Sequence, residues 1–385
     1  MSIKPTSYIE LSQSALANNL TFIRNIIGSE VEMVSVVKGN AYGHGISSYV
    51  PLAKELGVDS FAVFSTYEAQ EVLHTHIKYE RIIVMGGYFE DEIEWMISNG
   101  IEFFVYDVQI LKSVIRAAAK LMKQAKIHVE LETGLNRTGI DKDRLTDAAT
   151  LITQNRQHLD LIGVCSHFSG AENISNYYRI KKQISSFNRM NKAFKVKGIE
   201  FENKHLACSA ALINYPKTML DMVRVGIMQY GFWPSKEVKM AYMIKHKNKI
   251  DPLKRVISWK SRVLSVKYVK EGEFVGYGNA ALAETNMKTV IVPIGYGYGY
   301  SRSLSNIGRV LIKGIRLNVI GNVNMNMIIV DATNIDEVNI GDEVVLIGNQ
   351  EDNTISVGSF SDLSEQLNYE LLTRLPENIE RKITL

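Results

Sequence analysis

The chain has 385 residues, and its 44 Lys and Arg residues nearly balance its 41 Asp and Glu residues. The small, scattered positive excess argues against a nucleic-acid partner, and the length predicts two domains. No apolar run reaches the roughly 18 residues of a membrane span, and the first ten residues lack a secretory signal. The two cysteines, Cys165 and Cys208, fit a reducing cytoplasm and are too few for a disulfide framework or a zinc site.

Residues 11–27 have the apolar spacing of an amphipathic helix and precede a regular alternation of strand-like and helix-like segments. Apolar residues recur at spacings of three and four in 46–57, 108–124 and 176–195, as expected for helices. Eight short runs rich in Val, Ile and Phe are nearly continuously apolar, which is typical of strands buried on both faces. These runs are 31–37, 60–65, 81–86, 102–107, 127–132, 161–168, 205–210 and 222–227.

Strands that alternate with helices predict parallel pairing with right-handed crossovers. Eight such units over roughly 200 to 250 residues predict a (β/α)8 barrel. The rival is a doubly wound open sheet, but no G-x-G-x-x-G follows the first strand.

The pattern changes after residue 234. A lysine-rich stretch with two prolines is interpreted as a surface connection, and strand signals punctuated by Gly and Asn then predict a mainly antiparallel β domain. A short polar helix is expected at 359–368. The predicted domains are a barrel at 1–234, a linker at 235–255 and a β domain at 256–385.

Polar side chains stand near the carboxyl ends of five predicted barrel strands, where such barrels place their reactive groups. They are Lys38, Arg137, His167, Ser209 and Arg224. Each alone is more often structural, but five at one rim indicate a site.

A partly desolvated lysine can attack an aldehyde to form a Schiff base, which points to pyridoxal phosphate as the cofactor. Gly226 and Ile227 lie at a strand-to-loop junction whose backbone N–H groups can bind a phosphate, and Ser209 can add a hydroxyl.

Many blocks of this sequence also resemble the alanine racemase family, in the order in which that family has them. They are "VVKGNAYGHG", "TGLNRTG", "SHF", "CSAA", "VRVGIMQYG", "VGYGN", "PIGYGYGY", "NVNMNM" and "LNYELLTRLP". The resemblance implies a barrel followed by a β domain, a head-to-tail homodimer with shared active sites, and cytoplasmic production of D-alanine for peptidoglycan.

The resemblance also assigns roles. It implies racemisation of an amino acid, expected to be alanine, by two bases: Lys38, which holds the cofactor, and Tyr277, contributed by the partner subunit. Removal of the α-proton from one face and its return on the other requires two opposed bases. The implied cofactor contacts are Lys38, Tyr42, His167, Ser209, Arg224, Gly226, Ile227 and Tyr369. The implied substrate contacts are Arg137 and Met325, and no metal is implied.

Arg224 matches the arginine that donates to the pyridine nitrogen. A guanidinium does not give up its proton, so the ring nitrogen is expected to stay uncharged. The resulting weaker electron sink would limit side reactions such as transamination.

Three residues depart from the family pattern. Glu130 stands where many members have a carbamylated lysine, and we expect it to orient Arg137 without carbon dioxide. Asn326 replaces an aspartate, and Tyr298 replaces an acid near the entrance. These changes leave serine, lysine or a broad set of amino acids open as alternative substrates.

Other functions remain alternatives at this point. A pyridoxal phosphate carrier would resemble the barrel alone, and the β domain argues against it. A decarboxylase on a similar plan would place an acid at the ring nitrogen, where this chain has Arg224. A metal-dependent barrel enzyme would need paired His and carboxylate ligands at the rim, which the pattern lacks.

Overall fold

A computed structural model of the chain describes residues 5–247, 250–358 and 368–385. These residues form two compact units that are interleaved along the sequence. The barrel unit comprises Ser14–Ala41 and Val50–Lys254, and the β unit comprises the described residues of Met1–Gln13, Tyr42–Tyr49 and Arg255–Leu385. Each unit is described separately.

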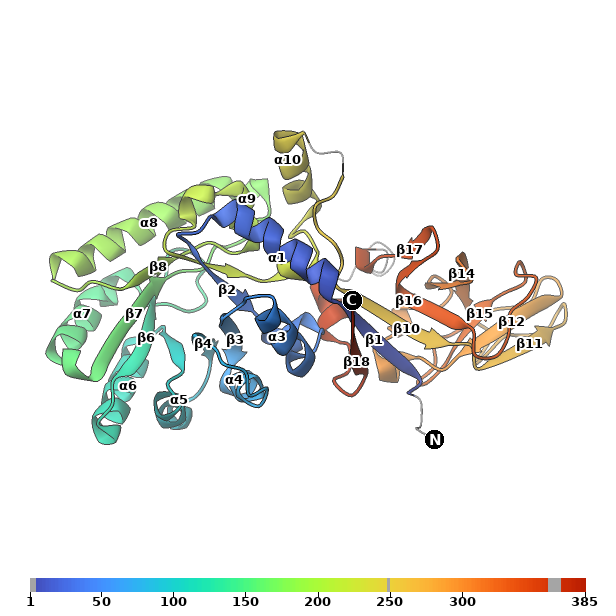
Figure 1. Ribbon diagram of the computed structural model, residues 1–385, viewed down its shortest axis with the longest axis horizontal. Helices are drawn as coiled ribbons and strands as arrows, with labels where there is room; N and C mark the ends of the chain where they lie inside the picture. Colours follow the sequence, from blue (N-terminus) through green and yellow to red (C-terminus); the bar gives the residue numbers. More distant parts are fainter. Residues whose placement is uncertain (1–4, 248–249, 359–367) are drawn as a thin grey trace. The chain divides into compact units, whose positions relative to one another are not determined.

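Eight parallel strands form the sheet of the barrel unit, in the order β8-β7-β6-β5-β4-β3-β2-β9 (Figure 1). Backbone hydrogen bonds from Asp221 N to Lys204 O (3.1 Å) and from Arg224 N to Ala207 O (3.0 Å) join the two end strands. The sheet is thus a nearly closed barrel, which confirms the predicted fold. The strands are β2 Glu32–Val36, β3 Ser60–Ser65, β4 Arg81–Gly87, β5 Glu102–Val105, β6 Ala125–Glu130, β7 Leu159–Cys165, β8 Asn203–His205 and β9 Met222–Val225.

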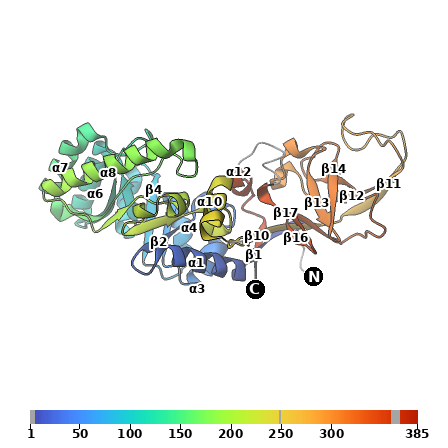
Figure 2. The same cartoon turned by 90° about the horizontal axis from the view of Figure 1, so that it is seen from above.

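Helices cover the outer side of these strands (Figures 1 and 2). Helix α6 shows why they do so: Asp107 caps its first turn by accepting from Gln109 N (2.6 Å). Leu111, Val114 and Ala118 recur on one face and are buried. The longer helices are α1 Gln13–Ile27, α3 Ile46–Glu55, α4 Thr66–Leu73, α6 Val108–Leu121, α7 Leu145–Gln154, α8 Tyr177–Val196 and α10 Lys236–His246.

The stretch interpreted from the sequence as a surface connection contains helix α10. Ser235 caps it by accepting from Val238 N (3.2 Å), and Val238 is fully buried. The Tyr242 ring packs edge-on against Phe22 of α1, with ring centroids 5.2 Å apart. Few apolar residues of this helix are buried and several of its residues are lysines, so the sequence pattern predicts the helix only weakly.

The β unit is built on one mostly antiparallel sheet in the order β11-β12-β15-β14-β13-β16-β10-β1-β18, with β17 paired to β16. Its first and last strands, β1 and β18, are parallel neighbours, with Tyr8 opposite Glu380. The predicted β domain is confirmed, whereas the expected polar helix at 359–368 lies almost wholly outside the described residues. The strands are β1 Ser7–Ser12, β10 Ile257–Arg262, β11 Ser265–Val269, β12 Met287–Val292, β13 Arg309–Ile312, β14 Ile315–Ile320, β15 Ile328–Asp331, β16 Glu343–Gln350, β17 Asn353–Ile355 and β18 Glu380–Thr384.

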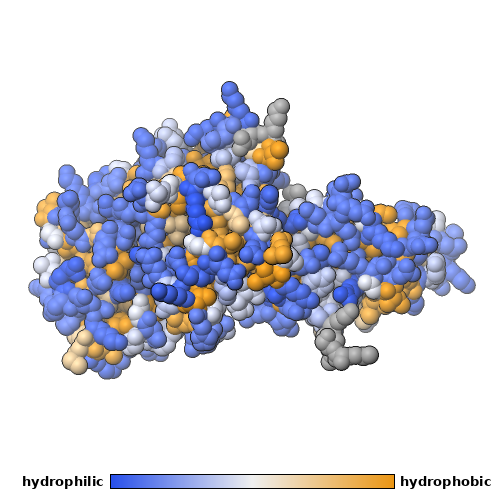
Figure 3. All heavy atoms as spheres, in the orientation of Figure 1, coloured by the Kyte–Doolittle hydropathy of each residue, from blue (hydrophilic) through white to orange (hydrophobic). Residues whose placement is uncertain are grey.

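Hydrophilic side chains are interspersed with smaller apolar areas on the face shown in Figure 3. Within the described ranges, no helix is long and apolar enough to cross a membrane. The same part of the chain contains no group of three or more His, Cys, Asp or Glu residues arranged to hold a metal ion.

Candidate active site

Lys38 follows the carboxyl end of β2, and a carboxylate fixes the backbone around it. Glu68 of α4 accepts from Gly39 N (2.6 Å) through one oxygen and from Phe64 N (2.7 Å) through the other. The residues from Gly39 to Tyr42 are all left-handed, with φ between 51° and 62°. A left-handed conformation costs a residue with a side chain about 1–2 kcal/mol, so Glu68 stabilises a backbone that would otherwise be unfavourable.

The Lys38 amine has a lowered pKa. The main cause is desolvation by surrounding protein atoms, and the charges of Arg137 and Arg224 act in the same direction, opposed by Glu68. The Lys38 side chain is nevertheless exposed. An amine that is both crowded and accessible is neutral more often than a free lysine and can act as a nucleophile or a base.

Arg224 of β9 is 4% exposed and lies at the same end of the barrel. Its Nη2 donates to the Ser166 carbonyl (2.9 Å), and its Nη1 donates to Nδ1 of His205. His167 follows β7 and has a pKa lowered to about 3, first by burial and then by the charges of Arg224, Arg137 and Lys38. His167 is therefore neutral at physiological pH.

Ser209 and Ile227 lie together where β8 and β9 end. The Ser209 hydroxyl accepts from Gly226 N (3.0 Å), so its own proton is left to donate to a further acceptor. Ser209 begins the short helix α9, and Ile227 begins a short 3₁₀ helix; both residues are buried. Two converging helix starts and a hydroxyl donor are suited to an oxyanion such as a phosphate.

Arg137 lies in the loop after β6 and is exposed. Glu132 shapes this loop by accepting from Asn136 N (2.8 Å) and Gly134 N. Glu130, at the end of β6, is 3% exposed, and its Oε2 has no hydrogen-bond partner among the described residues. Burial raises the pKa of Glu130, while a hydrogen bond from Thr138 and the charges of Arg224 and Arg137 lower it.

The structure thus brings together all the predicted site residues of the barrel unit: Lys38, Arg137, His167, Ser209, Arg224, Gly226 and Ile227. Their chemistry fits a ligand with an aldehyde for Lys38, an acceptor nitrogen for Arg224 and a phosphate for Ser209 and the Ile227 N–H. The two guanidinium groups of Arg137 and Arg224 favour an anionic ligand over a neutral one. The sequence interpretation missed Glu68 and His205, because neither an acid in the first turn of a helix nor a buried histidine stands out in one sequence.

The remaining predicted residues belong to the β unit, so their association with the barrel site stays a prediction. Tyr277 is 74% exposed between Gly276 and Gly278, which have φ of 76° and 67°, and its carbonyl accepts from Asn322 Nδ2 (2.9 Å). Tyr42 is half-buried, and nothing is described of the Tyr369 side chain.

Met325 is 57% exposed, and its loop is tied to the loop that carries Tyr298. Tyr296 N donates to Asn324 O (3.0 Å), and Gly297 N donates to Met325 O (2.9 Å). Two of the departures from the family pattern, Tyr298 and Asn326, therefore lie in one pair of hydrogen-bonded loops.

Known protein families and curated relatives resemble this chain over nearly its whole length. Residues 11–234 match the family model described as "Alanine racemase, N-terminal domain", and residues 256–383 match "Alanine racemase, C-terminal domain". The chain is 36% identical over 374 residues to a curated alanine racemase of Clostridium perfringens (strain SM101 / Type A), covering 97% of this chain and 94% of that protein.

Solved structures of alanine racemases are also similar to this chain over nearly its whole length. The structure matches alanine racemase of Clostridium difficile 630 with a TM-score of 0.90 and 28% identity, covering 100% of this chain and 97% of that one. It also matches alanine racemase of Bartonella henselae, solved with covalently bound pyridoxal phosphate, with a TM-score of 0.85 and 25% identity over 99% of this chain and 100% of that one.

Proposed function

Because this chain belongs to the alanine racemase family, we propose that it is a pyridoxal phosphate-dependent isomerase that interconverts L-alanine and D-alanine. The observation that carries the proposal is the set of donors at the barrel rim. A lysine of lowered pKa, a buried guanidinium and a hydroxyl beside a helix start match the aldehyde, the ring nitrogen and the phosphate of this cofactor.

Lys38 holds the cofactor covalently in this proposal. Arg224 donates to the ring nitrogen, and Ser209 and the Ile227 N–H bind the phosphate, with Gly226 N orienting Ser209. Neutral His167 contributes a ring without adding a further positive charge beside Arg224. When bound, pyridoxal phosphate supplies an electron-accepting ring that acidifies the α-carbon of the amino acid. The contacts of Tyr42 and Tyr369 with the phosphate are part of the same proposal.

Two bases then move the α-proton. Lys38 acts on one face of the substrate, and the partner subunit's Tyr277 acts on the other. The lowered pKa of the Lys38 amine makes its neutral form more available, so that it can accept a proton and return it. The exposure of Tyr277 on an isolated chain is what a residue used across a head-to-tail dimer interface requires. We place this homodimer in the cytoplasm.

Arg137 and Met325 are the proposed substrate contacts. An exposed guanidinium can bind the carboxylate of the amino acid. Glu130 supports Arg137 electrostatically, because a buried carboxylate near two guanidinium groups already supplies a negative charge. We propose that this support needs no carbon dioxide.

A screen of the L-enantiomers of the chiral standard amino acids tests the proposal. Each is incubated with the protein and pyridoxal phosphate, and loss of optical rotation is followed, with Lys38→Ala as the control. We expect L-alanine to be the best substrate and the variant to be inactive. Turnover of serine or lysine in preference to alanine would refute the substrate, and no turnover of any amino acid would refute the activity.

A further inference from the structure

A continuous hydrogen-bonded chain of buried side chains runs from Arg224 into the barrel. Nη1 of Arg224 contacts Nδ1 of His205, and Nε2 of His205 lies 3.0 Å from Nδ1 of His128. Nε2 of His128 lies 2.9 Å from Oε2 of Glu102. Each of the four residues is at most 5% exposed. They come from β9, β8, β6 and β5, so the chain crosses the curved inner face of the sheet.

Only one pattern of donors and acceptors satisfies this chain. A guanidinium has donors only, so His205 must accept at Nδ1 and donate from Nε2–H. His128 must then accept at Nδ1 and donate from Nε2–H to Glu102. Protonation of His128 at Nδ1 would place two hydrogens opposite each other across 3.0 Å. Both rings are therefore neutral, and every hydrogen bond points from Arg224 towards Glu102.

Gly163 of β7 makes room for the two rings. A Cβ atom at residue 163 would lie 2.2 Å from Nδ1 of His128 and 3.1 Å from Nε2 of His205, the two atoms that share the hydrogen bond. Phe104 packs on the same residues, with its ring centroid 5.8 Å from each imidazole centroid and 5.9 Å from Cζ of Arg224. The contact between the histidines thus depends on a glycine of β7 and an aromatic ring of β5.

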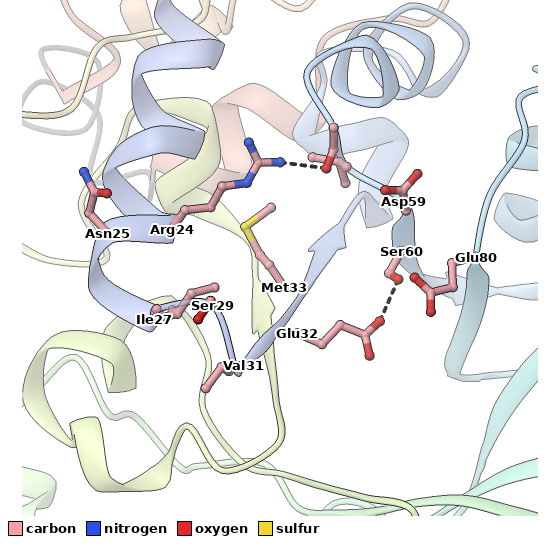
Figure 4. Close-up of a pocket in the computed structure, with 13 residues that line it drawn as sticks. Arg24, Asn25, Ile27, Ser29, Val31, Glu32, Met33, Asp59, Ser60 and Glu80 are labelled. Carbon is pink, nitrogen blue, oxygen red and sulfur yellow. Dashed lines mark hydrogen bonds between the residues drawn. The ribbon is translucent and has the colours of Figure 1, made fainter.

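Ion pairs extend this hydrogen-bonded chain to the opposite end of the barrel. Nη1 of Arg81 lies 3.4 Å from Oε2 of Glu102, and Nε of Arg81 lies 3.0 Å from Oε1 of Glu32. Ser60 donates to the same Glu32 oxygen (2.7 Å) at the pocket shown in Figure 4. Two guanidinium groups and two carboxylates balance each other, with two neutral imidazoles between them. The hydrogen bonds from Arg224 to Glu102 are aligned and buried, so they polarise one another.

We infer that His128 is a positioning residue: by accepting from Nε2–H of His205 it holds that ring in place, and the ring in turn fixes the orientation in which Arg224 presents its guanidinium. Glu102 is the final acceptor of the hydrogen-bonded chain. Gly163, which has no side chain, leaves the space in which the two imidazole rings meet. No proton leaves Arg224, so the chain orients and polarises a donor and does not act as a proton wire. The inference rests on the proposed function, in which Arg224 faces the cofactor ring.

The tautomers can be observed directly. The chain has 8 histidines, so the protein loaded with pyridoxal phosphate is labelled with ¹⁵N-histidine, and loss of signals in His128→Gln identifies His128. We expect two buried imidazoles with protonated Nε2 and bare Nδ1. Gly163→Ala should shift the Nδ1 signal of His128 and the Nε2 signal of His205. Nδ1-protonated rings in the wild type, or an unchanged spectrum in folded Gly163→Ala, would overturn the inference.

A pair of substitutions at His128 tests the consequence for catalysis. The Gln amide offers one acceptor and one donor and can replace the ring in the chain, whereas Leu cannot. We expect His128→Leu to lower kcat for L-alanine about tenfold to hundredfold with little change in KM, as is typical when an outer partner of a site residue is lost. His128→Gln should recover most of kcat. His74, which is 61% exposed and follows the last residue of α4, provides the matched control as His74→Leu.

Unchanged kcat in His128→Leu, or an equal loss in the Gln and Leu variants, would overturn the inference. Failure of this inference can be told apart from failure of the proposed racemase activity. A wild-type protein that shows the expected tautomers but racemises no amino acid refutes the activity alone.

Discussion

Glu68 links the backbone of the lysine loop to the electrostatics of its amine, and Glu68→Gln perturbs both. The carboxylate accepts from Gly39 N (2.6 Å) and Phe64 N (2.7 Å) through its two oxygens. An amide keeps one acceptor oxygen, so one hydrogen bond to a charged group is lost. Such a bond contributes about 1.5–3 kcal/mol, and the half-buried position of Glu68 favours the lower end of that range.

A loss of about 1.5 kcal/mol corresponds to a decrease in Tm of about 3–6 °C for a unit of this size. The same variant removes the charge that raises the pKa of Lys38, so that pKa should fall further. Thermal unfolding measures the first effect. The pH dependence of acylation of Lys38 in the cofactor-free protein measures the second, and its rise should move to lower pH.

Glu71→Gln on the same helix is the matched control, because the Glu71 side chain is 40% exposed and its salt-bridge partner among the described residues is the exposed His74. It should change Tm by less than about 1 °C, as is usual for surface substitutions. An equal Tm for Glu68→Gln and Glu71→Gln, together with an unmoved acylation profile, would refute the role given to Glu68.

The other predictions concern the cofactor site and its pH range. Ser209→Ala should weaken pyridoxal phosphate binding about tenfold to hundredfold through loss of a charge-assisted hydrogen bond, measured by fluorescence titration; unchanged affinity would exclude the hydroxyl from the phosphate site. His167 has a folded-state pKa of about 3, so the unfolded chain binds the extra proton between that value and about pH 6.5, and stability to urea should fall as pH drops through this window. His167→Gln should flatten the dependence, and a slope unchanged by the variant would contradict the assignment. Activity should be equal in buffers stripped of carbon dioxide and in buffers with bicarbonate, because Glu130 already carries the charge; recovery of activity only with bicarbonate would point to a carbamate elsewhere.

The barrel could be predicted from the sequence because its strands are continuous apolar runs. The run 31–37 contains β2, and 222–227 contains β9, although the two strands pair across the length of the domain. Strand β1 was missed because it is short, with two buried apolar side chains, Ile9 and Leu11, and has no local partner. Its neighbours β10 and β18 lie far along the chain, and pairing at that distance leaves no trace in a local pattern.

The position of the site at the barrel rim could be predicted from topology, because the carboxyl ends of parallel strands lie at the same end of the barrel. That rule located Lys38 and Arg224 but says nothing of what supports them. The His128–His205 contact reaches across β7 at Gly163, and it depends on side-chain directions that only the folded barrel defines. A histidine two residues before Glu130 carried no signal of such a role.

The central claim is that the Lys38 amine carries the cofactor, and one labelling experiment tests it most directly. The protein is incubated with pyridoxal phosphate, reduced with borohydride, digested and mapped by mass spectrometry. The account predicts a single phosphopyridoxyl group on the peptide that contains Lys38. A label confined to another lysine, or no label at all, would contradict it.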